Sequence, residues 1–260
     1  MRTMTKTRNS KSIKSDEEID LIRESSRMVA KTLDLLGTMI RPGIMTLELD
    51  QAAEDFIRSN GGVPSFKGYR GFPASICASV NSEVVHGIPG SRVLRDGDII
   101  SIDVGVMKGG YHGDGACTFA VGEIKEEAVR LLKTTKDALM AGIRKAVPGN
   151  LIRHVSAAIQ KVVEDAGCSV VTDYTGHGIG RSMHEEPQVP NFVIPGDKNM
   201  LASGMTLAIE PMVNIGGSEV MTKADGWTVV TKDGSLSAHF EHTVAVKEDA
   251  AQILTRLGEC

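Results

Sequence analysis

The sequence predicts an α+β protein built from two copies of one unit, with pseudo-twofold symmetry and antiparallel sheets covered by helices. Residues 94–103 (LRDGDIISID) resemble residues 201–210 (LASGMTLAIE) at an offset of 107 residues, and each segment ends in a carboxylate. A Pro-Gly pair precedes each segment, at positions 42–43 and 148–149, an offset of 106 residues. This period is longer than that of stacked repeat arrays, so it indicates a duplicated unit of helices and strands.

Residues 1–15 are expected to form a polar, basic tail. The segment has no acid before Asp16, and it lacks the apolar stretch of a secretory signal. Its basic residues are Arg2, Lys6, Arg8, Lys11 and Lys14. Such a composition is typical of a disordered tail, and a basic arm that touches RNA or a ribosome is the alternative.

The first half, residues 16–124, is expected to run from a helix through a Pro-Gly turn to a second helix and then to strands. After the Pro-Gly pair, apolar residues recur at helical spacing until Gly61, a residue suited to ending a helix. These apolar positions are Leu49, Ala52, Ala53 and Phe56. The segment 98–106 (DIISIDVGV) then has the β-branched pattern of a strand.

The second half, residues 125–250, repeats this order, and residues 251–260 are expected to form a C-terminal tail. Its second helix has the same spacing and stops at Gly167. The apolar positions are Val155, Ala158, Ile159 and Val162. Residues 239–246 (HFEHTVAV) match 112–121 more loosely, with a shift of two residues.

A predicted hairpin places two aspartates on one face. Residues 108–110 (KGG) form the turn, and the return strand runs through Asp114. With a two-residue turn, the numbers of paired residues sum to 217 or 219, and in either register Asp103 and Asp114 share a face. Like charges this close destabilise a sheet unless a cation lies between them. Two solvated surface aspartates are the alternative for this pair taken alone.

The second half supplies two more acids in apolar surroundings. Glu210 occupies the position equivalent to Asp103, and Glu241 begins an apolar strand. Buried acids are rare unless they are paired or bind metal. Four converging carboxylates would balance two divalent ions, and oxygen ligands with one or two imidazoles suit Mn, Fe, Co or Zn. Two such ions can share a hydroxide that acts as a nucleophile near neutral pH.

Three histidines lie in loops beside glycine or proline, where functional residues concentrate. They are His86 (VVHGIP), His177 (TGHGIG) and His184 (MHEEP). The remaining four are expected to be structural, with His154 on a helix surface: His112, His154, His239 and His242.

Composition excludes several classes of protein. The net charge of −4 gives no indication of a nucleic-acid surface, and no apolar run approaches the roughly 20 residues of a membrane helix. The four cysteines form no C-x-x-C pair, which argues against a zinc knuckle or a disulfide scaffold. The pattern fits a reducing compartment, so a cytoplasmic protein is expected.

The motifs together resemble the type I methionine aminopeptidases across residues 16–250. They are 81–89 (NSEVVHGIP), 102–104 (IDV), 112–114 (HGD), 176–180 (GHGIG), 183–187 (MHEEP), 209–212 (IEPM) and 240–243 (FEHT). The resemblance implies a single catalytic domain with the pita-bread fold, in agreement with the duplication. It also implies a monomer that removes the first methionine of nascent chains when the second residue is small.

The resemblance further implies roles for individual residues. The two divalent ions would be held by Asp103, Asp114, His177, Glu210 and Glu241. Asp114 and Glu241 would bridge the ions, and Glu210 would also act as the general base. His86 would contact the substrate near the scissile peptide, and His184 would stabilise the oxygen of the tetrahedral intermediate.

The resemblance places the methionine side chain in an apolar pocket. Together with His86 and His184, the substrate would contact Tyr69, Phe72, Cys77, Met183 and Trp227. Met183 stands where many relatives carry an aromatic residue, and methionine is soft enough to fill the same space.

Two other functions share parts of this pattern. Aminopeptidase P and prolidase have the same five ligands, but they usually carry an additional N-terminal domain, for which about 15 polar residues leave no room. A catalytically inactive pita-bread protein that only binds partners would have lost ligands, whereas all five are present here.

Overall fold

Four long helices come in two pairs, one pair in each half of the chain. The computed structural model describes residues 13–256. Its helices are α1 (Asp16–Met39), α2 (Thr46–Ser59), α3 (Glu126–Ile143) and α4 (Ile152–Asp165). The start of α1 is capped reciprocally, because the Ser15 side chain accepts the Glu18 N–H while the Glu18 carboxylate accepts the Ser15 N–H.

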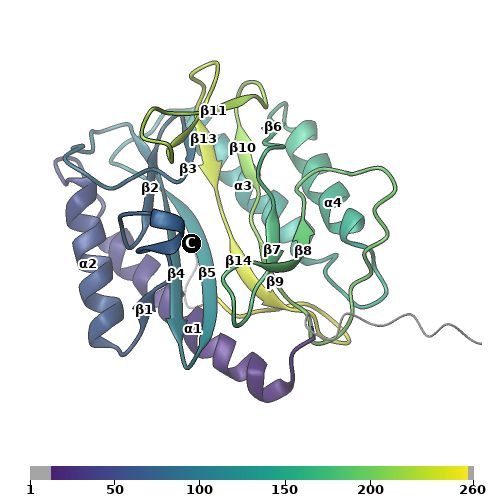
Figure 1. Cartoon of the computed structure of the whole chain (residues 1–260). Helices are drawn as coiled ribbons and strands as arrows, with labels where there is room; N and C mark the ends of the chain where they lie inside the picture. The colour runs from purple at the N-terminus through teal and green to yellow at the C-terminus, as the bar shows by residue number, and fades with distance from the viewer. Residues whose placement is uncertain (1–12, 257–260) are drawn as a thin grey trace, which may run out of the picture.

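The strands pair in antiparallel fashion, and in the view of Figure 1 they occupy the middle of the molecule, in front of α1 and α3 and with α2 and α4 at the two sides. The first half contains β1 (Val63–Pro64), β2 (Cys77–Val80), β3 (Glu83–Val85), β4 (Ile99–Lys108) and β5 (Tyr111–Ala120), with a 3-10 turn, η2, at Tyr69–Gly71. The second half contains β6 (Ser169–Val170), β7 (Gly176–Gly178), β8 (Glu185–Val189), β9 (Thr206–Ile209), β10 (Met212–Asn214), β11 (Val220–Thr222), β12 (Val229–Thr231), β13 (Ser237–His239), β14 (His242–Ala245) and β15 (Gln252–Ile253).

Within the described residues, these strands form four sheets. One has the order β1-β4-β2 with β5 paired to β4, and the others have the orders β13-β10-β6, β11-β12-β3 and β15-β14-β9-β7-β8. Helix α1 packs on β4 and β5, and α3 packs on β9, β10 and β13. The pairing of β3 with β12 joins the two halves directly.

The duplication predicted from the sequence is confirmed by equivalent backbone hydrogen bonds in the two halves. The Gly43 N–H donates to the Leu94 carbonyl at 2.8 Å, and the Gly149 N–H donates to the Leu201 carbonyl at 3.0 Å. Isolated bridges join Met45 to Val93 in one half and residues 151 and 200 in the other. Each Pro-Gly turn is therefore tied to the segment that leads into a central strand.

The β4–β5 hairpin adopts the register in which paired residue numbers sum to 219. Asp103 pairs with Ala116, and Asp114 pairs with Gly105, so the two aspartates share a face without being directly opposite. This register makes Gly109 and Gly110 the two turn residues, with φ of 60° and 80°. The other register would force a lysine into the left-handed region, which costs a non-glycine residue free energy.

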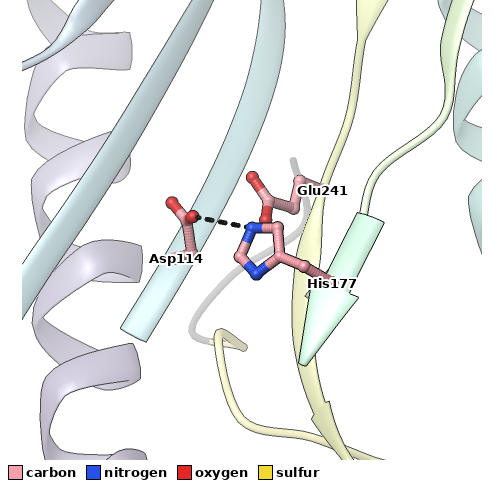
Figure 2. A group of neighbouring side chains, drawn as sticks. All are labelled: Asp114, His177 and Glu241. Atoms are coloured by element: carbon pink, nitrogen blue, oxygen red, sulfur yellow. Dashed lines mark ion pairs between the residues drawn. The ribbon is translucent and has the colours of Figure 1, made fainter. Parts of the chain in front are cut away.

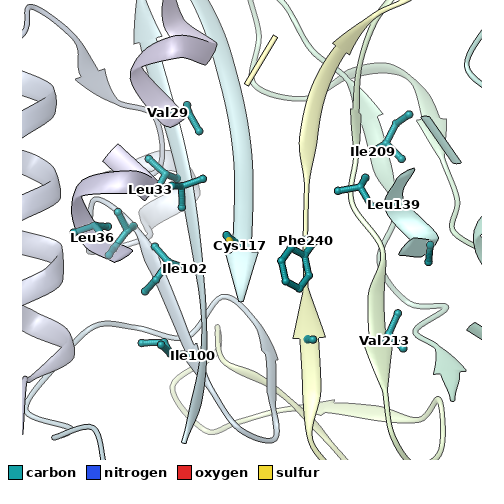
Figure 3. Close-up of a cluster of buried hydrophobic side chains, with 14 of the residues drawn as sticks. Val29, Leu33, Leu36, Ile100, Ile102, Cys117, Leu139, Ile209, Val213 and Phe240 are labelled. Carbon is teal, nitrogen blue, oxygen red and sulfur yellow. The ribbon is translucent and has the colours of Figure 1, made fainter. Parts of the chain in front are cut away.

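One hydrophobic core spans both halves of the chain (Figure 3). Val29 and Leu33 of α1 and Ile102 of β4 belong to the same cluster as Ile209 and Phe240 of the second half. Cys117 is also part of this core and is 2% exposed. The halves therefore share one core around the central strands.

Residues at both ends of the described chain, which were expected to lie in tails, pack against the rest of the fold. At the start, Ile13 bridges Met205, and Lys14 is only 8% exposed. At the end, β15 pairs with β14, and Leu254 and Thr255 are buried. These contacts join the residues next to α1 and after β14 to distant parts of the sequence. Residues 1–12 and 257–260 lie outside the described part of the chain.

Within the described residues, no helix has both the length and the apolar character needed to span a membrane.

Candidate metal centre and active site

The five predicted ligands lie on strands of both halves or directly beside them. Asp103 lies in β4, Asp114 in β5 and His177 in β7, while Glu210 follows β9 and Glu241 lies between β13 and β14. Ligand atoms of Asp114, His177 and Glu241 lie within 4.8 Å of one another, and their side chains point toward a common centre (Figure 2). The His177 Nε2 is 3.8 Å from the Asp114 Oδ2 and 3.5 Å from the Glu210 Oε1.

Strand β5 of the first half runs beside the segment around Glu241 in the second half, and this contact brings Asp114 close to Glu241. The Glu241 N–H donates to the Ala116 carbonyl of β5 at 2.9 Å. The Thr243 side chain accepts the Asp114 N–H at 3.0 Å and donates to the Asp114 carbonyl at 2.7 Å. Contacts between β5 and the segment around Glu241 therefore bring carboxylates from the two halves into one cluster.

Two glycines allow His177 to enter the centre from β7. A Cβ at Gly176 would lie 2.4 Å from the Ala208 carbonyl oxygen, and one at Gly178 would lie 2.4 Å from the Glu186 carbonyl oxygen. Only glycine fits such an approach between β8 and β9. The glycines around His177 thus hold its ring against the carboxylates.

Burial and mutual repulsion disfavour ionisation of the acids. Burial raises the pKa of Glu210 to about 8. Burial, together with the nearby Glu210 carboxylate, raises the pKa of Asp103 to about 7. The pKa values of Asp114 and Glu241 are also raised well above their ordinary values, first by burial and then by the neighbouring carboxylates. A cation among these groups would remove the repulsion.

The imidazole of His177 is in the form that binds metals. Burial lowers its pKa to about 4, so the ring is neutral. Its Nδ1 lies 2.9 Å from the Gly178 carbonyl oxygen. Because a carbonyl only accepts, Nδ1 carries the proton and the lone pair of Nε2 faces the carboxylates.

The residues fit a divalent cation. Asp103 Oδ1 and Glu241 Oε1 are buried and have no hydrogen-bond partner among the described residues. Orphaned buried carboxylate oxygens are costly unless an ion or another donor satisfies them. Four carboxylates and one neutral imidazole supply oxygen-rich ligation of the kind that Mn, Fe, Co and Zn accept.

Of the two predicted catalytic histidines, His184 lies against His177, and His86 lies beside Trp227 of the apolar cluster. The ring centroid of His184 is 4.3 Å from that of His177, and its Nδ1 is 2.9 Å from the Tyr69 hydroxyl. The rings of His86 and Trp227 pack edge to face, with their centroids 6.4 Å apart. Burial lowers the pKa of His86 to about 4. Its backbone φ is 59°, an uncommon value for a residue with a side chain, as occurs at functional sites.

The predicted pocket residues form one apolar cluster. It contains Tyr69, Phe72, Cys77, Met183 and Trp227, together with Phe66, Ala74 and Ile88. The ring centroids of Phe72 and Trp227 are 5.2 Å apart, edge to face. Cys77 pairs directly with Asp103 in the β2–β4 ladder, so this cluster adjoins the carboxylates.

Sequence reasoning missed several residues of the site. His239 was expected to be structural, yet its buried Nε2 lies 3.5 Å from the Glu210 Oε2. His239 stands two residues before Glu241, and residues two apart in an extended segment point to the same face, so this spacing was a signal for His239. Phe66, Ala74 and Ile88 carried no comparable signal, because distant segments bring them to the pocket.

The other three histidines have contacts of an ordinary structural kind. His112 Nδ1 lies 2.9 Å from the Ser65 hydroxyl, and His242 Nδ1 lies 2.9 Å from the Thr255 hydroxyl. His154 accepts the Leu151 N–H at the start of α4, as a helix cap.

Comparison with known proteins identifies the family. The model for metallopeptidase family M24 matches residues 20–248. A methionine aminopeptidase of Clostridium acetobutylicum is 53% identical over 244 residues, covering 94% of this chain and 98% of that protein. The crystal structure of methionine aminopeptidase from Rickettsia prowazekii matches with a TM-score of 0.92 and 40% identity, covering 94% of this chain and 99% of that one.

A more distant match shows the breadth of the fold. The prolidase from Pyrococcus furiosus matches with a TM-score of 0.79 at 22% identity, and the match covers 67% of that chain. This likeness shows the shared pita-bread fold alone. The matched residues and the near-complete coverage of the curated relative show that the chain belongs to metallopeptidase family M24, within its methionine aminopeptidases.

Proposed function

We propose that this chain is a metal-dependent aminopeptidase that removes the N-terminal methionine from nascent proteins and peptides whose second residue is small. The observation that carries the proposal is the convergence of Asp114, Glu241, Glu210 and His177 beside an apolar cluster. The centre suits hydrolysis, and the cluster suits one uncharged side chain.

We further propose that two divalent ions occupy the centre. Asp114, His177 and Glu241 would hold the ions together with Asp103 and Glu210. Ions of this kind activate water as a nucleophile and polarise a carbonyl. The unpartnered oxygens of Asp103 and Glu241 support this ligation.

The chain's own groups would move the protons and hold the substrate. Glu210 would take the proton of the attacking water on its carboxylate, which lies 3.5 Å from the His177 ring within the cluster. If the Tyr69 hydroxyl donates to Nδ1 of His184, the proton of that ring lies on Nε2. Nε2–H could then donate to the oxygen of the tetrahedral intermediate. His86, beside Trp227, would contact the scissile peptide.

The apolar cluster would select the first residue of the substrate. Phe72, Cys77 and Met183 are almost completely buried and offer no charged partner. Placing an unpaired charge among them would cost several kcal/mol, so charged first residues should be rejected by orders of magnitude. Leucine should be rejected less strongly, because apolar pockets discriminate shape by only about 1–3 kcal/mol.

The test is hydrolysis of four peptides with Mn or Co added: Met-Ala-Ser, Met-Lys-Ser, Leu-Ala-Ser and Arg-Pro-Pro. Met-Ala-Ser should be cleaved fastest, Leu-Ala-Ser slowly, and the other two negligibly. Preferential cleavage of Arg-Pro-Pro would indicate an aminopeptidase P. Failure to cleave any peptide by fully metallated protein would indicate an inactive binding protein. Metal analysis of the same sample should give two ions per chain.

We also propose that the protein is a cytoplasmic monomer that meets nascent chains at the ribosome. The three described cysteines are free, as expected in a reducing compartment. The basic residues between 2 and 11 are the proposed ribosome contact. Co-sedimentation with ribosomes should weaken when residues 2–11 are deleted and when salt is raised. Light scattering should give the mass of one chain.

A further inference from the structure

The loop of residues 179–184 between β7 and β8 carries two groups of the proposed site. Met183 is 2% exposed within the apolar cluster, and His184 lies beside His177. On one side, the Tyr69 hydroxyl contacts His184. The contacts on the other side of the loop therefore determine where Met183 and His184 lie.

The carboxylate of Glu185 closes the loop at its C-terminal end. Its Oε1 accepts the Ser182 N–H at 3.1 Å, across Met183 and His184. Its Oε2 accepts a hydrogen bond from the Lys14 Nζ at 2.7 Å. The side chains of Lys14 and Glu185 are only 6% and 18% exposed, so this ion pair is mostly removed from water.

Lys14 is itself anchored by the rest of the fold. Its N–H donates to the Gly204 carbonyl at 2.8 Å, and the preceding residue, Ile13, bridges Met205. Its stem packs on the loop backbone, because a Cβ at Gly180 would lie 2.5 Å from the Lys14 Cε. The segment before α1 thus reaches the far half of the molecule and contacts the loop directly.

We propose that Lys14 is a positioning residue: through Glu185 it holds the 179–184 loop so that His184 and Met183 face the metal centre. The inference rests on the proposed function, since it assigns the loop's purpose to peptide hydrolysis. Its ion pair with Glu185 and its packing against Gly180 both fall on the loop and its C-terminal end, so Lys14 acts through the loop.

Removal of the Lys14 ammonium should loosen the loop rather than empty the metal centre. Glu185 would keep a partly buried charge without its cation, which favours movement of the carboxylate toward water. That movement would also break the hydrogen bond that the Glu185 carboxylate accepts from the Ser182 N–H. Displacement of a catalytic group by about 1 Å can cost roughly a hundredfold in rate.

The experiment compares Lys14→Met with Lys247→Met. Methionine keeps most of the stem and removes the charge. Lys247 is a matched control, because its Nζ also pairs with an acid at 2.7 Å, but that acid is Asp16, the first residue of α1, and not Glu185. We expect kcat for Met-Ala-Ser to fall roughly ten- to a hundredfold in Lys14→Met and to stay within about twofold in Lys247→Met. Metal content should stay unchanged in both.

Two further measurements separate positioning from general destabilisation. His184→Ala should cost much less in the Lys14→Met background than in the unaltered protein, because contributions made through one group are not additive. Glu185→Gln, which keeps the size of the side chain, should show a smaller loss of the same kind. This variant preserves the test if Lys14→Met does not fold.

Hydrogen–deuterium exchange of residues 179–186 provides a readout that does not depend on activity. Exchange should be faster in Lys14→Met, with Glu185→Gln intermediate and Lys247→Met unchanged. Unchanged exchange, or full additivity with His184→Ala, would overturn the inference. An unaltered protein that cleaves no peptide would instead refute the proposed function, while exchange would still decide whether Lys14 orders the loop.

Discussion

Glu210 stands where the apolar strand β9 enters the carboxylate cluster. Its Oε1 lies 3.5 Å from His177, its Oε2 lies 3.5 Å from His239, and its side chain is 13% exposed. A carboxylate in this position can serve both as a ligand and as a proton acceptor. The amide of glutamine is nearly isosteric with it but takes no proton.

Glu210→Gln should therefore lower turnover by roughly 10²–10⁴-fold, the usual range for loss of a general base. Steady-state kinetics on Met-Ala-Ser and metal analysis of the same sample provide the measurement. Turnover within twofold of the unaltered protein at full metal loading would exclude Glu210 as the base.

His184, unlike Glu210, is proposed to act without binding metal. His184→Ala should reduce kcat and kcat/KM together by about a hundredfold or more, as expected when a donor to the transition state is lost. The metal content should stay at the level of the unaltered protein. Loss of an ion in this variant would show that the division between ligands and catalytic histidines is wrong.

Strand β7 shows how a secondary-structure element determines the site. It lies between β8 and β9, and its glycines let the strand approach both neighbours closely enough for His177 to reach the carboxylates. A Cβ at Gly176 would meet backbone oxygens of both neighbouring strands, Ala208 and Val189. Backbone atoms in a sheet cannot move away as a flexible side chain can.

Gly176→Ala should therefore destabilise the fold by about 1–3 kcal/mol, as overpacking does, and should weaken metal binding by displacing His177. Thermal unfolding and metal titration measure the two effects. Gly90→Ala is the control, because a Cβ at Gly90 meets nothing within 4 Å and its φ is not left-handed. Its stability should change by no more than about 0.5 kcal/mol. If Gly176→Ala and Gly90→Ala were equally stable, the proposed clash between a Cβ at Gly176 and the neighbouring strands would be wrong.

For the molecule as a whole, the metal centre joins the two halves of the chain. Asp103 and Asp114 come from the first half, and His177, Glu210 and Glu241 come from the second. Bound ions stabilise the folded state by linkage, by roughly 3–4 kcal/mol at 100 to 1,000 times the dissociation constant. Chelation should lower the unfolding temperature by on the order of 10 °C for a protein of this size.

The effect of chelation should grow with pH. Without metal, the folded protein holds protons on Asp103 and Glu210 up to about pH 7 and 8, whereas the unfolded chain releases them near its ordinary values of 3.8 and 4.5. A raised folded-state pKa of an acid lowers stability as pH rises through this window. The difference in stability between the metal-bound and the metal-free protein should thus be larger at about pH 8 than at about pH 5.5. Calorimetry at both pH values, with and without metal, measures this. A larger effect of chelation at the lower pH would contradict the assigned shifts.

The duplication, the five candidate ligand residues and the elements near them could be predicted from the sequence. Local signals were sufficient for the α2 and α4 helices, each bounded by a Pro-Gly turn and a glycine, and for the β4–β5 hairpin with its two-glycine turn. The motifs around His86, His177 and His184 also identified the family. These features depend on residues near one another along the chain, or on repetition, and both can be read without coordinates.

The tertiary structure alone decided which distant residues meet. The contact of His239 with Glu210, the completion of the pocket by Phe66, and the ion pair of Lys14 with Glu185 all join segments that no local pattern connects. The hairpin register also became definite only when Gly109 and Gly110 were seen to occupy the turn. The physical reason is that these positions follow from long-range strand pairing and a core shared by both halves, and so from the packing of the whole chain.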